Sequence, residues 1–228
     1  MSSSGGGTVN AVLYVIVLAC AVRAGAVLLG GDITRALRRP PVAAVALWLI
    51  VAIPSLAQLA FPGLLQALER DPDQIRQHEQ WWRLFTSAVV QDGGIAGTVF
   101  NLVILAVVAV VAIRAWGPLR GLIIFAVGVV GFDLATTFAW PSVGAGTSAA
   151  TFTLAASVTG LAVVKTRERV MVVLVAVTAG CGIFLLALRD AHGSAVIGGL
   201  VIGVLAGTIS PPGIISASAA PAARTDAR

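Results

Sequence analysis

Seven long apolar runs constrain this chain more than any other feature of its sequence. Each run is about 18 residues or longer and almost free of charge, which is the length that an α-helix needs to cross a bilayer. Only 11% of the 228 residues are charged, whereas a typical soluble domain carries roughly 25%. The predicted spans are Val9–Leu29, Val42–Phe61, Ile95–Ile113, Leu119–Trp140, Ser148–Lys165, Val170–Leu188 and Gly193–Ser210. We therefore expect an all-α, multi-pass membrane protein that resides in the lipid bilayer.

Basic residues between the spans predict their orientation. The loop after the first span, the turn after the third, the link after the fifth and the C-terminal tail fall on one side, and together they hold ten Lys and Arg residues. The opposite side holds four. Such an excess marks the cytoplasmic face, so we expect the N-terminus outside, the C-terminus in the cytoplasm and the protein in the plasma membrane. The same distribution explains the net charge of +5, and no nucleic-acid partner is expected.

The sequence offers no motif for a cofactor or a metal ion. Its two cysteines, Cys20 and Cys181, fall inside different predicted spans and are expected to be packed thiols. The chain has no nucleotide-binding glycine motif and no metal-ligand spacing. We therefore predict no cofactor and no metal, and only the topology supports a channel or a transporter.

The segment Gly144–Ala156 is the strongest candidate for chemistry. A short loop of small residues leads to Ser148 at the start of the fifth predicted span. The free N–H groups of a helix's first turn, together with the helix dipole, can stabilise an anion that forms at this serine. The alternative interpretation is a serine near the start of a tightly packed membrane helix, which is more common.

Motifs in the same chain order surround this serine. They are Trp82-Arg83 in the longest external loop, Gly97 to Asn101 in the third span, Gly146-Thr147-Ser148-Ala149 before the fifth span, and Ala195 to Gly203 in the seventh. Their order, spacing and membrane side resemble those of the rhomboid family, the intramembrane serine proteases.

The resemblance implies a fold, a partner and a set of site residues. Residues 42–210 would form the rhomboid-like membrane domain with its six-helix core. Residues 1–41 would add an N-terminal transmembrane helix and a basic cytoplasmic loop, and residues 211–228 would be a disordered cytoplasmic tail. Ser148 would be the nucleophile, and Asn101 and Gly146 would hold the oxyanion. The clients would be transmembrane-helix proteins.

Three departures from the family pattern affect the expected activity. The position of the family's catalytic histidine is occupied by Val196, which cannot move a proton. The position of its oxyanion histidine is occupied by Gly97, and Ala149 replaces the glycine after the nucleophile. The favoured hypothesis is therefore a catalytically degenerate protein that still binds transmembrane-helix clients.

The alternative hypothesis is an active intramembrane serine protease that uses His192 as a displaced base. Only His78 and His192 are present, and His78 is expected to be solvated beside Glu79. His192 precedes Val196 by one helical turn, which is a displacement of about 6 Å. Helical side chains lean toward the N-terminus, so a ready-made pair of Ser148 and His192 is not expected. Whether the protein is an enzyme stays open at this point.

Asp133 is a carboxylate within a predicted span, where such a group usually has a partner. One hypothesis is that it orients His192 or a water near Ser148. The favoured one is a helix-end carboxylate that reaches the membrane interface or Arg189.

Small residues and aromatic residues predict two further features. Gly198, Gly199 and Gly203 are expected to let the seventh span pack closely against the fifth. The segment Trp81–Thr86 is aromatic and basic, so we expect it to lie against the outer leaflet as a partly buried loop and not as a span.

Overall fold

All seven predicted spans are helices in the structure. The computed structural model describes residues 7–209, which contain seven helices long and apolar enough to cross a membrane. These are α1 (Thr8–Leu28), α3 (Val42–Ala60), α7 (Gly94–Trp116), α8 (Pro118–Leu134) with its π-helical end η2 (Ala135–Ala139), α9 (Ser148–Thr166), α10 (Arg169–Ala187) and α11 (His192–Ile209). Every helix end lies within three residues of the prediction. The expected all-α fold is confirmed, and the predicted tail over 211–228 lies outside the described residues.

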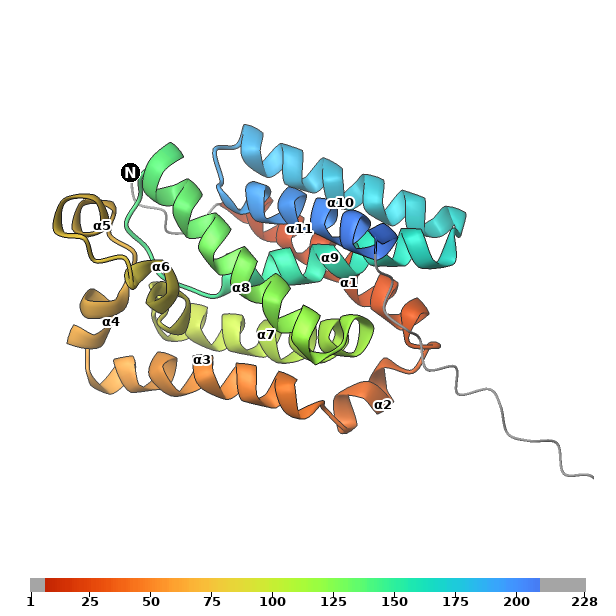
Figure 1. Ribbon diagram of the computed structural model, residues 1–228, viewed down its shortest axis with the longest axis horizontal. Coiled ribbons are helices and arrows are strands. Elements are labelled where there is room, and N and C mark those ends of the chain that lie inside the picture. The colour runs from red at the N-terminus through yellow and green to blue at the C-terminus, as the bar shows by residue number, and fades with distance from the viewer. Residues whose placement is uncertain (1–6, 210–228) are drawn as a thin grey trace, which may run out of the picture.

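Shorter helices fill the links between the spans. They are α2 (Ile33–Arg38) after α1, and α4 (Gly63–Leu68), α5 (Pro72–His78), α6 (Arg83–Thr86) and the 3₁₀ turn η1 (Ser87–Val89) between α3 and α7. The Asp71 side chain starts α5 by accepting the first free N–H groups, and Pro72 takes the first helical position. Helices α4, α5 and α6 gather at one end of the bundle (Figure 1).

The segment Trp81–Thr86 does not span, as predicted, but much of it is the short helix α6. Trp81 and Trp82 are about half exposed, whereas Arg83 is buried. The Arg83 guanidinium donates to the carbonyl oxygens of Gln66 and Glu69 at 3.0 and 2.7 Å. This arginine therefore ties α6 to α4.

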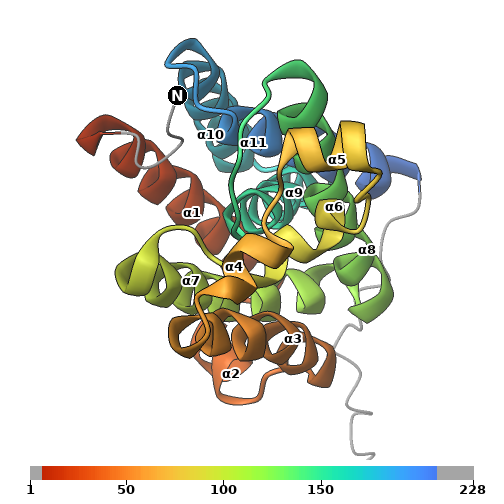
Figure 2. The same ribbon diagram turned by 90° about the vertical axis from the view of Figure 1, so that its left-hand side faces the viewer.

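Helix α9 is the central helix, and the other spans surround it (Figure 2). Within its apolar window 78% of the residues are buried, against 28–44% for the other six spans. Small and hydroxylated residues allow this crowding. Thr151, Thr153 and Ser157 donate their hydroxyls to carbonyls three or four residues earlier, so these buried groups are satisfied within the helix.

Helices α9 and α11 touch backbone to backbone. A Cβ atom on Gly199 would collide with the backbone of Thr153, and one on Gly203 with the backbone of Ser157. From the other side, a Cβ on Gly160 would lie 2.6 Å from the carbonyl oxygen of Leu200. The predicted packing of the seventh span on the fifth is confirmed for Gly199 and Gly203.

Gly198 was expected to join this packing face, and that expectation is wrong. A Cβ on Gly198 would meet no atom within 4 Å. The physical reason is helical geometry, because Gly198 is rotated by about 100° from Gly199 and leaves the contact stripe.

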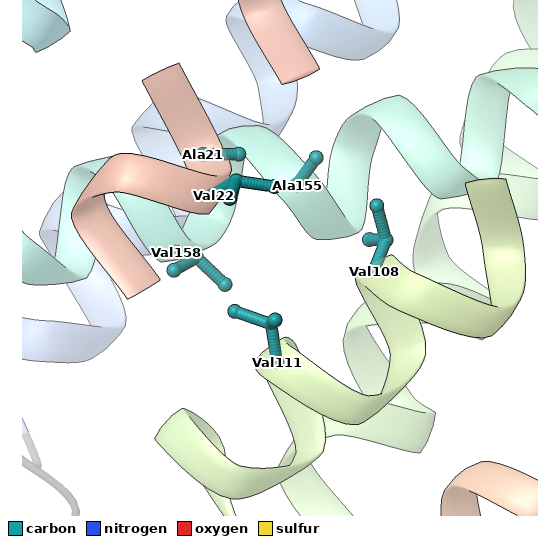
Figure 3. Close-up of a pocket in the computed structure, with 6 residues that line it drawn as sticks. All are labelled: Ala21, Val22, Val108, Val111, Ala155 and Val158. Atoms are coloured by element: carbon teal, nitrogen blue, oxygen red, sulfur yellow. The ribbon is translucent and has the colours of Figure 1, made fainter. Parts of the chain in front are cut away.

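The N-terminal helix α1 is an integral part of the bundle. It packs against α7, α9 and α10 (Figure 2). Gly25 permits the close approach to α7, because a Cβ there would overlap the Val111 side chain. Where α1 meets α7 and α9, six apolar side chains leave a cavity of about 10 Å³ (Figure 3). Such a cavity is too small and too apolar for a ligand.

We predict that Gly199→Leu destabilises the protein by about 1–3 kcal/mol, because the added side chain overpacks the α9–α11 contact. The same substitution at Gly198 is the matched control, since that position opens to free space. Thermal and denaturant unfolding in detergent measure both variants. Equal stability of the two variants would contradict the packing.

Candidate active site

Backbone hydrogen bonds fix the loop before Ser148 at two positions, Gly144 and Gly146. Backbone bonds of 2.9 and 3.0 Å join Arg70 and Gly144 in an isolated antiparallel bridge. Further along, the N–H of Gly146 donates to the carbonyl oxygen of Ser87 at 2.9 Å. Gly146 has φ = +146°, a conformation that side-chain-bearing residues rarely adopt. Glycine at position 146 is therefore required by the turn that delivers Ser148 to the first position of α9.

Ser148 and His192 are in direct contact. The Oγ atom of Ser148 lies 2.8 Å from Nε2 of His192. The expectation that the two would be too far apart is wrong. It placed His192 before the seventh span and assumed a side chain leaning away from the slot at Val196. In the structure His192 itself begins α11, level with Ser148 at the start of α9.

Asp190 completes a chain of three polar side chains. Its Oδ1 atom lies 2.8 Å from Nδ1 of His192 and also accepts the backbone N–H of His192 at 2.9 Å. Because an ionised carboxylate can only accept, Nδ1 of a neutral His192 carries the proton and Nε2 is free to accept from Ser148.

The electrostatics keep Asp190 charged. Asp190 lies in the link between α10 and α11. Burial alone would raise the pKa of its carboxyl group, but hydrogen bonding and charge interaction with His192, together with the Tyr14 hydroxyl, hold the pKa well below its usual range. Asp190 is therefore a carboxylate at neutral and mildly acidic pH.

Two residues of α1 bind the other oxygen of this carboxylate. Asn10 donates from Nδ2 to Oδ2 of Asp190 at 2.7 Å, and the Tyr14 hydroxyl donates to the same oxygen. The Tyr14 oxygen also lies 3.2 Å from Nδ1 of His192. Asp190, Tyr14 and Asn10 were not among the residues predicted from the sequence. The available signals were an Asp two residues before a helix-starting His and the chain's single Tyr within an apolar run.

Aromatic rings enclose the imidazole of His192. The rings of Tyr14 and Phe132 lie 5.4 Å from it between centroids, and that of Phe152 lies 5.8 Å away. Phe152 is one turn after Ser148 on α9. These contacts limit the rotation of the imidazole and shield its hydrogen bonds from water.

Of the two predicted oxyanion residues, Gly146 lies beside Ser148, and Asn101 lies beside Gly146. A Cβ on Gly146 would be 3.9 Å from Oγ of Ser148 and 3.6 Å from Nδ2 of Asn101, so these groups border one space. Asn101 donates one amide hydrogen to Oε1 of the buried Gln91 at 2.7 Å. The amide has a second hydrogen besides the one that this bond uses. Gln91 was not predicted, and it orients the Asn101 amide.

Gln91 is held in turn by α3. Gln58 and Gln91 exchange two hydrogen bonds of 2.6 and 2.8 Å through the backbone of Gln91, and Gln91 donates to Ser55 at 3.2 Å. A polar network thus runs from α3 to Asn101. Buried amides of this kind fix one side-chain orientation when every group is paired.

Val196 and Gly97, two of the three positions predicted to depart from the family pattern, differ in their surroundings. Val196 is completely buried and lies against Gly182 of α10, so apolar packing surrounds the position at which the resemblance led us to look for a histidine. Gly97 has free space, because a Cβ there would meet no atom within 4 Å.

The other histidine, His78, is exposed at the end of α5. Within residues 7–209 no three His, Cys, Asp or Glu side chains are grouped as metal ligands.

Asp133 has a partner that neither hypothesis named. Its Oδ1 lies 2.6 Å from the Arg70 guanidinium, and both side chains are 6% exposed. Oδ2 accepts from the Ser87 hydroxyl. Both hypotheses for Asp133 are therefore corrected: it pairs with Arg70, not with His192 or Arg189. Because Arg70 also donates to the carbonyl oxygen of Ser142 at 3.1 Å, the pair anchors the loop that precedes Ser148.

Comparison with known proteins agrees with this architecture. A family model described as Rhomboid domain matches residues 78–212, more than half of the chain. The chain belongs to the rhomboid family. The match contains both Ser148 and His192, whereas the predicted start of the rhomboid domain at residue 42 stays a prediction. No curated protein and no solved structure matches the chain.

We predict that Arg70→Met destabilises the protein by about 3–5 kcal/mol, because it leaves the Asp133 carboxylate buried without its partner. Arg76→Met is the matched control. Arg76 pairs with Asp73 at 3.2 Å on the surface, where the side chains are 38% and 68% exposed, and such pairs contribute about 1 kcal/mol or less. Unfolding in detergent compares the two, and equal losses would show that the Arg70 pair is not a buried anchor.

Proposed function

We propose that this rhomboid protein is an intramembrane serine protease. Ser148 is the nucleophile, His192 the general base and Asp190 the group that orients the base. The observation that carries the proposal is the continuous contact from Oγ of Ser148 to Nε2 of His192 and from Nδ1 to the Asp190 carboxylate, each 2.8 Å long. Distances of about 2.6–3.2 Å are those that proton transfer requires.

The geometry supports a complete acyl-transfer cycle. Oγ of Ser148 attacks the scissile carbonyl carbon while its proton passes to Nε2 of His192. The carbonyl oxygen becomes an oxyanion, for which Nδ2 of Asn101 and the N–H of Ser148, the first residue of α9, are donors. When the tetrahedral intermediate collapses, the C–N bond breaks and His192 returns the proton to the leaving amine. A water molecule then repeats the sequence on the acyl-enzyme and releases Ser148.

His192 removes the main objection to catalysis. The hypothesis of a degenerate protein depended on Val196, but an imidazole reaches Ser148 from four residues earlier in the chain. Gly97 remains a real departure, because it takes away one side-chain donor for the oxyanion. Loss of one such donor costs about 10²–10³-fold in rate, so we expect a slow protease and not an inert one.

The substrate class we propose is a transmembrane-helix protein cut near the outer face of the plasma membrane. The site lies at the beginning of α9 and of α11, beside the first two turns of α1. With the excess of basic residues on the cytoplasmic side, this end of the bundle faces outward and the N-terminus is outside. A scissile bond would therefore reach Ser148 just below the outer membrane surface.

Labelling of the purified protein with a fluorophosphonate probe tests the proposal. Wild type should label, and Ser148→Ala should not. His192→Ala should slow labelling by about 10²–10⁴-fold, since a positioned base contributes that much. His78→Ala is the control, because this histidine is exposed at the end of α5 and does not belong to the Ser148–His192–Asp190 chain, so its loss should change nothing. Absence of labelling in a folded wild-type protein would favour the degenerate, client-binding hypothesis instead.

A further inference from the structure

We infer that α1, the helix added before the rhomboid core, is part of the catalytic centre, with Tyr14 and Asn10 as positioning residues that act through Asp190. The inference rests on the proposed function and adds two residues to it. Both bind the carboxylate that holds the base, and the Tyr14 oxygen also lies 3.2 Å from Nδ1 of His192.

The hydrogen bonds of Asp190 divide between its two oxygens. Oδ1 accepts the backbone N–H and Nδ1–H of His192, while Oδ2 accepts the Tyr14 hydroxyl and the Asn10 amide. A carboxylate has about four acceptor positions, so its full capacity is used. With donors on both oxygens the carboxylate plane cannot rotate, and Oδ1 stays directed at the imidazole.

The donors from α1 are electrically neutral. A positively charged partner would compete with the imidazolium that forms during proton transfer, whereas a hydroxyl and an amide stabilise the carboxylate without doing so. Asn10 is only 7% exposed and the Asp190 side chain only 10%. At that burial the hydrogen bonds are stronger than they would be in water.

The packing of α1 does not depend on these polar contacts. Val17, Ala21 and Ala24 are buried further along the helix and hold it in the bundle. The Tyr14 ring itself lies 4.9 Å from that of Phe152 between centroids, a contact that phenylalanine would keep. Tyr14→Phe therefore removes one oxygen atom and leaves the helix in place.

The first test is the kinetics of fluorophosphonate labelling, separated into the binding constant of the probe and the maximal rate of inactivation. Tyr14→Phe and Asn10→Leu should each lower the maximal rate about 3- to 10-fold, the equivalent of one hydrogen bond, without a change in probe binding. Val15→Leu is the control, because Val15 is on the same helix and 58% exposed. A variant that merely loosened the fold would change probe binding and thermal stability as well.

The second test does not require activity. With only two histidines in the chain, protein labelled with ¹⁵N-histidine gives a simple spectrum, in which His192→Ala and His78→Ala assign the signals. The Nδ1–H of His192 should resonate at low field because a carboxylate accepts it. Tyr14→Phe should move this resonance, and Val15→Leu should not.

The outcomes separate the two proposals. If wild type does not label but the low-field proton is present and depends on Tyr14, the proposed function fails and the positioning role stands. If wild type labels and both α1 variants match it in inactivation rate and in the position of the resonance, the inference about α1 is overturned while the protease remains. If no low-field proton is seen in wild type, the inference is overturned as well.

Discussion

Backbone contact between α9 and α11 is the constraint on which the candidate site depends. Gly160 on one helix and Gly199 and Gly203 on the other bring the two backbones together without intervening side chains. Each helix begins with a residue of the candidate site, Ser148 on α9 and His192 on α11. Close packing along the helices therefore places these two first residues side by side. The contact between Ser148 and His192 is therefore a consequence of glycine packing deeper in the bundle.

His192, the proposed base, is at the start of a helix, and this position lets an imidazole reach Ser148 although valine occupies position 196. Val196 lies inside α11, where its side chain packs against α10. A residue at the first position is not restricted by a preceding helical turn, and the adjacent turn supplies Asp190 as an acceptor. Asp190 and His192, separated by one residue, thus supply the proposed orienting group and the proposed base together.

Much of the fold could be predicted from the sequence, because membrane spans follow from long apolar runs and glycine spacing. Ser148, Asn101 and Gly146 could be found from motifs that are local in the chain. Tyr14 and Asn10 could not, because they lie 176 and 180 residues from Asp190 in sequence and meet it only through the packing of α1. The wrong expectation for His192 had a different cause. The predicted span began at Gly193, but α11 begins one residue earlier, and this shift changes the direction of the His192 side chain. The prediction that Gly198 packs against α9 failed because adjacent helical positions face different neighbours.

The most direct measurement of the central claim is a double-variant cycle on the rate of Ser148 phosphonylation. The four proteins are wild type, Asp190→Asn, His192→Ala and the double variant. If Asp190 acts through His192, Asp190→Asn is slower than wild type, and the double variant is no slower than His192→Ala alone, since residues that act as a unit are not additive. A rate that is the same in all four proteins would contradict the account, because Ser148 would then react without the base.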